Sequence, residues 1–288
     1  MSHFLQTAIR TIWRVTFLAL HIMGGFLKVT YLRSSLGETW HLSTRGQATI
    51  SLWLERLSKI LGLHVNVKSP PLPVPTMVVA NHVSWLDIIA IGSVHPAYFL
   101  AKDDVRKWPL IGSLLAKAGT KFIRRNSASA VRECNKHLCH LLRIRQNVVV
   151  FPEGTTTDGT NVASFHPALF EVPHKAYTPI QPLAIRYLDL GKPDTVAPYI
   201  NDDIFIIHLW RILSRKVTYV ELNFLPPVSS REHRRQLSQK CHALIISALF
   251  DEKQKITPIP ILYQLPQRPK PREMIEGESD IEMLRNVS

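Results

Sequence analysis

The chain has 288 residues, of which 45% are hydrophobic and 20% are charged, a balance that excludes wholesale disorder. This length accommodates one large α/β domain, or a medium-sized domain with appendages. The formal net charge of +13 favours an anionic partner, such as nucleic acid, an acidic membrane surface, an acidic protein or a phosphate-bearing substrate. Three cysteines give no even disulfide framework and indicate a reducing, cytosolic environment.

The hydrophobic residues 12–32 near the N-terminus predict a helix that associates with a membrane. Only 13 residues between Arg14 and Lys28 are free of formal charge, whereas a bilayer crossing takes about 20 predominantly apolar residues. Because flanking basic side chains can snorkel, a tilted span and an interfacial helix remain alternatives. Residues 43–63 carry apolar side chains at helical spacing and predict a second, amphipathic helix. We therefore assign residues 1–65 to membrane-associating helices.

Residues 66–252 predict an α/β domain with a largely parallel mixed sheet flanked by helices, because short apolar runs alternate with helical segments. The predicted strands are 77–80, 97–101, 120–123, 147–151, 180–185 and 217–224. The predicted helices are 85–93, 108–117, 128–145 and 231–250. The last helix follows a capping-box pattern at Ser229 and Glu232. The Pro-rich and acidic residues 253–288 predict an extended, poorly ordered tail.

Polar segments follow three of the predicted strands and are expected to share one edge of the sheet. They are NHVSWLD from residue 81, RRN from residue 124 and PEGTTTDG from residue 152. Together they supply a base, a carboxylate, a basic pair and a turn rich in hydrogen-bond donors, which suit activation of a hydroxyl beside an anionic substrate. No G-x-S-x-G motif is present, which disfavours a hydrolase acting through an acyl-serine.

His82 is the predicted general base, because imidazole titrates near neutral pH and can accept a proton from an attacking alcohol. Asp87 is predicted to orient the ring, as carboxylates do in hydrolytic triads, although it could instead only close a capping box. On one continuous helix the two side chains would point about 140° apart, so His82 must lie on a turn before the helix. Ser84, three residues before Asp87, is the predicted N-cap of that helix.

Four motifs occur in order over roughly residues 60–225. They are NHVSWLD at 81–87, GTKFIRR at 119–125, FPEGT at 151–155 and PIQPL at 179–183. This ordered set resembles the glycerolipid acyltransferases typified by 1-acylglycerol-3-phosphate acyltransferase. The resemblance implies transfer of a fatty acyl group from a thioester donor, acyl carrier protein or acyl-CoA, to the free hydroxyl of a lysolipid acceptor. No cofactor is implied.

The resemblance also implies roles for individual residues. In this family the histidine of the first motif is the general base and its aspartate the partner, which correspond here to His82 and Asp87. The second and third motifs bind the phosphate and glycerol of the acceptor. Their residues here are Arg125, Glu153, Gly154 and Thr155. Ser84 and Lys121 lie in the same motifs and complete the set of candidate substrate-binding residues.

The head group of the acceptor depends on Thr156, where members that form phosphatidic acid commonly carry Arg or Ser. We expect 1-acylglycerol-3-phosphate as the acceptor, giving phosphatidic acid. A related branch acylates lyso-ornithine lipid, and the SWLDI and EGTTTDG variants of this chain are compatible with that acceptor. An alternative from another class is a membrane-associated protein that binds anionic lipids without catalysis, which would tolerate His82→Ala.

The charge pattern bears on partners and location. Residues 101–146 hold eleven Lys and Arg against three Asp and Glu, which fits an acidic carrier protein, the phosphates of coenzyme A or an anionic membrane. Nucleic-acid binding is disfavoured because aromatic residues are not interleaved with this basic block. No metal site is predicted, because Cys134, His137, Cys139 and His140 fall on one predicted helix without a second ligand pair. The expected location is the bacterial inner membrane, with the active site facing the cytoplasm.

Overall fold

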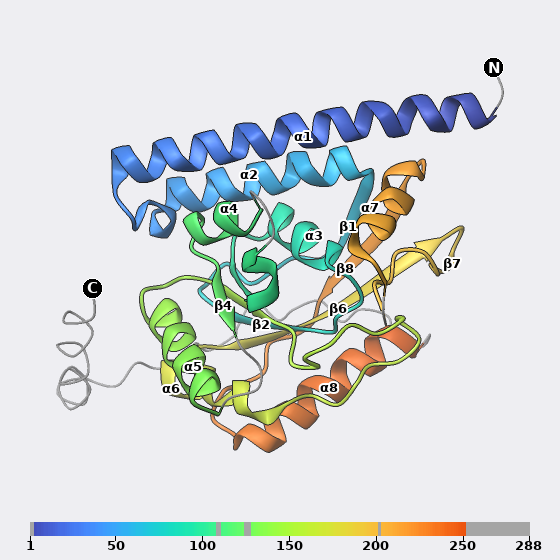
Figure 1. The fold of residues 1–288 in the computed structure, drawn as a ribbon. Helices are drawn as coiled ribbons and strands as arrows, with labels where there is room; N and C mark the ends of the chain where they lie inside the picture. The colour runs from blue at the N-terminus through green and yellow to red at the C-terminus, as the bar shows by residue number, and fades with distance from the viewer. Residues whose placement is uncertain (1–2, 108–110, 124–127, 201–202, 252–288) are drawn as a thin grey trace.

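The computed structural model describes residues 3–107, 111–123, 128–200 and 203–251, and a mixed sheet lies at its centre (Figure 1). The strand order is β1-β8-β6-β2-β5-β3-β4, with β7 paired to β6. Neighbouring strands are parallel, except that β6 is antiparallel to both β8 and β7, which confirms the predicted largely parallel sheet. The strands are β1 Leu63–Ser69, β2 Met77–Ala80, β3 Tyr98–Lys102, β4 Lys121–Ile123, β5 Val148–Val150, β6 Ile180–Asp189, β7 Lys192–Pro193 and β8 Thr218–Phe224.

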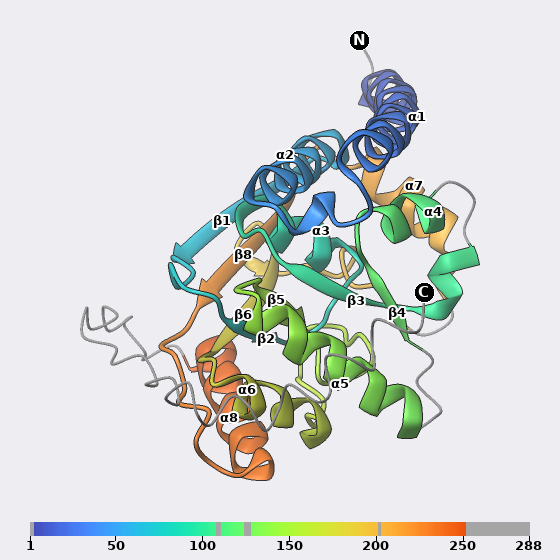
Figure 2. The ribbon, with the colours of Figure 1, turned by 90° about the vertical axis from the view of Figure 1, so that its left-hand side faces the viewer.

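Helices cover both faces of this sheet (Figure 2). One face packs against α2 Thr44–Leu61, α3 Leu86–Val94 and α7 Phe205–Ser214. The other packs against α5 Ala128–Arg143, α6 Glu171–Ala176 and α8 Arg234–Phe250. Successive strand side chains point to opposite faces, so Met77 joins the α5 and α8 core while Val78 joins the α3 core. The sheet is therefore buried on both sides, as its continuous apolar strands predict.

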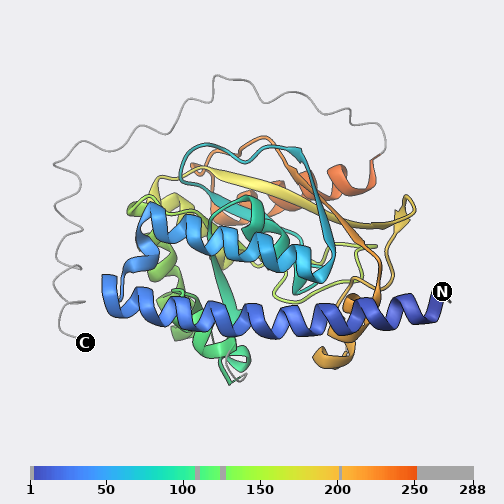
Figure 3. The same cartoon turned by 90° about the horizontal axis from the view of Figure 1, so that it is seen from above.

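The long helix α1 His3–Leu36 lies outside α2 and runs antiparallel to it across the molecule (Figures 1 and 3). The His21 ring of α1 stacks on the Trp53 ring of α2, with 4.7 Å between their centroids. At the N-terminal end of α1, Arg10 and Arg14 donate hydrogen bonds to carbonyl groups at the C-terminus of α7. Cations are favoured there because the last carbonyl groups of a helix have no partner within the helix.

The C-terminal half of α1 lies against α4 Ile111–Lys117 and the short 3₁₀-helix η1 Trp40–Leu42. Trp40 is buried between α1 and α4, and the ammonium group of Lys117 donates to Thr30 Oγ1 over 2.8 Å. Two further 3₁₀-helices connect the remaining elements. They are η2 Asp103–Lys107 and η3 Pro167–Phe170.

Besides the three short 3₁₀-helices, four of the described elements lie where the sequence predicts none, namely β1, α6, β7 and α7. The helix predicted over 43–63 ends at Leu61, because Gly62 adopts a left-handed conformation with φ 77°. A Cβ atom at Gly62 would also overlap the Arg14 guanidinium, so the end of that side chain would have to shift. The chain then enters β1 directly, and the domain boundary predicted after residue 65 falls inside this strand.

Helix α8 begins at Arg234, and the predicted capping box at Ser229 is wrong. Val228 exchanges two backbone hydrogen bonds with Ile180, which keeps the chain extended up to that point. The N-cap is instead His233, whose ring accepts a hydrogen bond from the Arg235 N–H. The tail predicted over 253–288 lies outside the described residues.

Candidate active site

The segments that follow β2 and β5 meet at one edge of the sheet, as expected. The two strands are adjacent and parallel, so their carboxyl ends lie side by side. The backbone N–H of His82 donates to Glu153 Oε1 over 2.6 Å, and the N–H of Thr157 donates to the His82 carbonyl oxygen over 2.8 Å. The turn after β2 is therefore held directly by the turn after β5.

His82 lies on the turn after β2, and its side chain contacts Asp87 in the first turn of α3. The distance between His82 Nδ1 and Asp87 Oδ2 is 2.8 Å, which confirms the predicted contact. Asp87 is fully buried, whereas the His82 side chain is 15% exposed. Because a carboxylate can only accept, Nδ1 carries the proton and Nε2 is left with a free lone pair. The imidazole also stacks on Phe151, with 4.1 Å between ring centroids.

The predicted N-cap role of Ser84 is wrong. Helix α3 begins at Leu86 with Trp85 as N-cap, and the buried Ser84 hydroxyl has no hydrogen-bond partner among the described residues. The capping runs the other way, because Asp87 Oδ2 accepts from the backbone N–H groups of Val83, at 2.8 Å, and Ser84, at 3.1 Å. Asp87 therefore orients His82 and caps the helix at once, so the two explanations of this residue describe one arrangement.

Glu153 is committed to the backbone of its own surroundings. Its Oε2 accepts from the N–H of Ala163 over 2.7 Å, while Oε1 holds His82 as described above. The carboxyl group is buried, and burial raises its pKa to about 7, with a further increase from the negative charge of Asp87. Since each oxygen accepts from a backbone N–H group, the structure gives Glu153 a role in holding the His82 turn.

The remaining residues of the third motif complete a hydrogen-bonded turn, in which the Gly154 N–H donates to the Phe151 carbonyl oxygen over 3.2 Å. Gly154 has φ 73°, a conformation that glycine adopts without steric cost, and Thr155 is exposed. Thr156 donates its hydroxyl hydrogen bond to the carbonyl oxygen of Tyr199. Thr156 therefore joins this turn to the segment before α7. Its hydroxyl group carries no positive charge.

The second motif is only partly visible at the site. Arg125 lies outside the described residues. Lys121 is the first residue of β4, and its Nζ atom is 2.8 Å from Glu133 Oε1 on α5. The structure therefore pairs Lys121 with α5 and shows no hydrogen bond or ion pair from it to His82 or Glu153.

No metal centre is found among the described residues, where no group of three or more His, Cys, Asp or Glu side chains could hold an ion. The cysteines Cys134, Cys139 and Cys241 are free thiols buried in the core between the sheet and its covering helices. Burial raises the pKa of the Cys134 and Cys241 thiols to about 12, as expected for unreactive core residues.

The structure adds Tyr187 on β6, which sequence reasoning missed. Its hydroxyl group donates to Asp87 Oδ1 over 2.7 Å, although the two residues are 100 positions apart. Asn81 connects the end of β2 to the same strand, because its side-chain amide forms two hydrogen bonds with the backbone of Ile185. Only the parallel pairing of β2 with β6 could have pointed to Tyr187, and no local sequence pattern does.

Helix α7 and the segment before it form another wall of the His82 turn. Trp85 donates its indole N–H to His208 Nδ1 over 3.1 Å, and His208 Nε2 contacts the Pro198 carbonyl oxygen over 3.0 Å. Burial lowers the pKa of His208, which keeps its ring neutral and able to accept from the indole. The N–H of Tyr199 donates to the Val83 carbonyl oxygen over 2.9 Å. These contacts join α7 to the His82 turn.

Comparisons with known proteins agree with this geometry. A family model described as Acyltransferase matches residues 64–186, which include His82, Asp87 and Glu153. A lyso-ornithine lipid O-acyltransferase from Pseudomonas aeruginosa is 41% identical over 199 residues, covering 69% of this chain and 77% of that protein. The chain belongs to the acyltransferase family. The resemblance expected from the four ordered motifs is thereby confirmed.

Other relatives of this acyltransferase act on a second lysolipid. A 1-acyl-sn-glycerol-3-phosphate acyltransferase from Neisseria gonorrhoeae is 34% identical over 212 residues, covering 73% of this chain and 83% of that protein. The crystal structure of the 1-acyl-sn-glycerophosphate acyltransferase PlsC from Thermotoga maritima matches with a TM-score of 0.63 and 20% identity, covering 89% of this chain and all of that one. At this identity the match shows a shared fold.

Proposed function

We propose that this acyltransferase moves a fatty acyl group from a thioester donor to the free hydroxyl of a lysolipid, with His82 as general base. The observation that carries the proposal is the 2.8 Å contact between His82 Nδ1 and the buried Asp87 carboxylate. This contact leaves Nε2 on the partly exposed side chain as the proton acceptor. The turn at Gly154 and Thr155 follows Glu153, which holds the backbone of His82, and this turn is proposed to bind the acceptor.

The reaction needs no covalent enzyme intermediate. His82 Nε2 takes the hydroxyl proton of the acceptor as its oxygen attacks the thioester carbonyl carbon, and Asp87 stabilises the imidazolium that forms. The tetrahedral intermediate then collapses by breaking the carbon–sulfur bond. The thiolate leaves with the proton held by His82, so the base is regenerated and an ester and a free thiol are the products.

The acceptor head group has two candidates. We retain 1-acylglycerol-3-phosphate, with Arg125 of the second motif as the proposed phosphate contact. Lyso-ornithine lipid is the second candidate, because Thr156 contacts Tyr199 and offers no positive charge to a phosphate. Relatives named for each of the two acceptors cover most of this chain.

The donor is proposed to be acyl carrier protein or acyl-CoA, both of which carry negative charge. Four basic side chains lie along the exposed face of α5, on the side of the sheet away from α1 (Figure 1). They are Arg132, Lys136, His140 and Arg143. An acidic carrier protein or the phosphates of coenzyme A would be attracted to this face.

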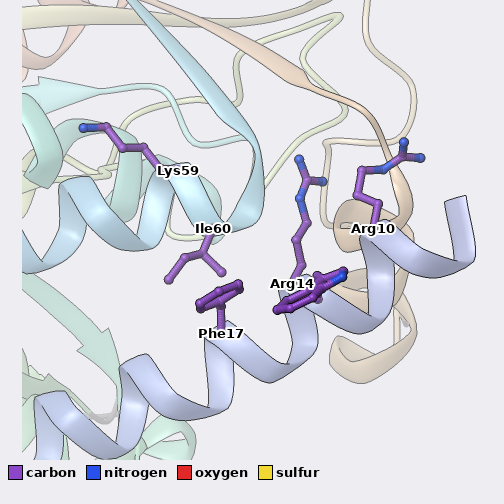
Figure 4. A pocket seen from close by; sticks show the side chains of 6 residues that line it. Arg10, Arg14, Phe17, Lys59 and Ile60 are labelled. Atoms are coloured by element: carbon purple, nitrogen blue, oxygen red, sulfur yellow. The ribbon is translucent and has the colours of Figure 1, made fainter. Parts of the chain in front are cut away.

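The protein is proposed to lie on the cytoplasmic face of the bacterial inner membrane through α1 and α7. The segment Leu5–Leu36 is long and apolar enough to cross a membrane, judged by length and composition alone. The contacts of α1 with α7 at one end and with α4 at the other hold it flat against the domain, which favours the interfacial alternative. A groove of about 330 Å³ between α1 and α2 is lined by basic and aromatic side chains (Figure 4). Side chains of both kinds are favoured in the head-group region of a membrane.

Membrane binding is expected to weaken about tenfold or more when Trp13→Ser on α1 and Trp210→Ser on α7 are combined, because each removes a large exposed apolar side chain. Sedimentation with vesicles of phosphatidylethanolamine and phosphatidylglycerol measures the bound fraction. The matched control is Tyr177→Ser, which changes an aromatic side chain of similar exposure at the end of α6, on the opposite face of the sheet. Equal binding by both variants would contradict the proposed surface.

The proposed reaction is tested by supplying the wild-type protein with acyl carrier protein and acyl-CoA donors and a panel of lysolipids. The panel contains 1-acylglycerol-3-phosphate, lyso-ornithine lipid and lysophosphatidylethanolamine. Ester formation with one of the first two identifies the acceptor, and the faster donor identifies the carrier. If no lysolipid is acylated with either donor, the proposal fails and a non-catalytic lipid-binding protein becomes the better explanation.

A further inference from the structure

Tyr187 completes the hydrogen bonding of Asp87 from β6, four residues beyond Leu183, the last residue of the fourth motif. Its hydroxyl group lies 2.7 Å from Asp87 Oδ1, and the Tyr187 side chain is 4% exposed while Asp87 is fully buried. We propose that Tyr187 is a positioning residue for acyl transfer, which holds Asp87 in the orientation that directs His82. This inference rests on the proposed function, because it assigns a role within that reaction.

The direction of the hydrogen bond follows from the chemistry of the two groups. Burial, together with the negative charges of Asp87 and Asp194, raises the pKa of Tyr187 well above its ordinary value. The phenol is therefore protonated throughout the pH range of the reaction. An ionised Asp87 can only accept, so the Tyr187 hydroxyl is the donor and stabilises the carboxylate charge.

The two oxygens of Asp87 have unequal support. Oδ2 accepts from His82 Nδ1 and from the backbone N–H groups of Val83 and Ser84. Within the described part of the chain, Oδ1 accepts only from Tyr187. Removing that hydroxyl would leave a charged oxygen buried without a donor, a situation that costs more than the net value of an ordinary hydrogen bond. The carboxylate would then rely more heavily on its remaining donors, among them the proton shared with His82.

The sheet explains how Tyr187 reaches this position. β6 pairs in parallel with β2, with Ala80 opposite Leu183. Alternate side chains of a strand share one face, so Leu183, Ile185 and Tyr187 all point into the core beneath α3. Tyr187 thus extends a row of core residues to the edge of the sheet, where its hydroxyl meets the first turn of α3.

The other ionisable groups near Tyr187 and Asp87 form their hydrogen bonds and ion pairs with other residues. Glu153 holds the backbone of His82 from the turn after β5. Asp194 forms an ion pair with Arg215 at 2.6 Å and accepts from backbone N–H groups of the segment before α7. A Tyr187→Phe substitution leaves these contacts in place, so its effect reports on the hydrogen bond to Asp87.

The decisive experiment compares the pH dependence of kcat/KM for the wild-type full-length protein, Tyr187→Phe and a matched control, Tyr98→Phe. Tyr98 is also 4% exposed, and its hydroxyl group donates to the His41 carbonyl oxygen over 2.9 Å, away from the His82 turn. For Tyr187→Phe we expect kcat to fall about tenfold, with KM unchanged. The acid limb of the profile should move upward by about one pH unit, because a less stabilised Asp87 carboxylate retains the imidazolium to higher pH.

Tyr98→Phe also removes a tyrosine hydroxyl, which contacts the His41 carbonyl oxygen and His41 Nδ1 at 2.9 and 2.8 Å, and it should keep the wild-type acid limb. An unchanged acid limb in Tyr187→Phe would overturn the inference. The inference would also be wrong if the rate of each variant fell only in proportion to its fraction of folded protein. If Tyr187→Phe does not fold, replacing Tyr187 by 3-fluorotyrosine preserves the ring and strengthens the donor, and the acid limb should then move to lower pH. A wild-type protein that acylates no lysolipid would overturn the proposed function itself, which is a separate result.

Discussion

Acyl transfer by the His82→Ala variant is expected to fall by about 10²–10⁴-fold, because alanine cannot accept the proton of the attacking hydroxyl. The loss should appear in kcat and in kcat/KM alike, since proton removal takes place in the transition state. Initial rates of ester formation, measured over a range of acceptor concentrations with a labelled acyl donor, separate the two parameters. The stability of the variant should change little, because Asp87 Oδ2 keeps the backbone N–H donors of Val83 and Ser84 when the imidazole is removed.

His64→Ala is the matched control for this substitution. His64 lies on the edge strand β1, where its ring is exposed and contacts Tyr219 edge-on at 5.3 Å between centroids. This variant should transfer acyl groups at the wild-type rate. If His82→Ala were as active as His64→Ala, another group would have to act as the base and the mechanism drawn from the site would be wrong.

Asp87→Asn should reduce kcat by a similar amount, about 10²–10⁴-fold, while costing only about 1–3 kcal/mol of stability. The new amide nitrogen fits best at the Oδ1 position, because the Tyr187 hydroxyl can turn and accept from it. The amide oxygen then keeps the Oδ2 contacts with His82 and with the backbone of Val83 and Ser84. Geometry is largely preserved, and the loss of rate reports on the missing negative charge beside the imidazolium.

Chemical denaturation and initial rates of transfer together test this prediction. Asp194→Asn is the matched control, because Asp194 is also a buried aspartate that accepts from two backbone N–H groups, and its charged partner is Arg215. We expect the control to lose stability and to keep most of its activity. Similar losses of activity in the two variants, in proportion to their loss of stability, would show that Asp87 acts only through the fold.

Much of the sheet and the location of the site could be predicted from local patterns. The apolar runs at 77–80 and 147–151 predicted buried strands, and polar residues directly after them predicted a shared edge of the sheet. Both expectations agree with β2 and β5 and with the contact between His82 and Glu153. This works because a strand buried on both faces must be continuously apolar, so that its end is marked by the first polar residue.

Elements with weaker patterns were missed for physical reasons. β1 is an edge strand with polar, partly exposed positions, and its sequence follows the amphipathic helix α2 with only Gly62 between them. The predicted caps at Ser84 and Ser229 were wrong because capping depends on contacts that the local sequence does not show. At α3 the Asp87 side chain accepts from the Ser84 N–H, and the Ser84 hydroxyl caps nothing. Before α8 the backbone pairing of Val228 with Ile180 keeps the chain extended.

The amino-acid sequence by itself determined the family, the class of fold, the catalytic pair His82 and Asp87 as a candidate, and the apolar N-terminal helix. These properties depend on residues close together in the chain, where spacing and periodicity carry the information. Only the tertiary structure decided that Glu153 holds the backbone of the His82 turn, that α1 is fastened to the end of α7, and that Tyr187 supports Asp87. Each of these contacts joins segments that are distant in sequence, and their geometry exists only once the strands have been ordered in the sheet.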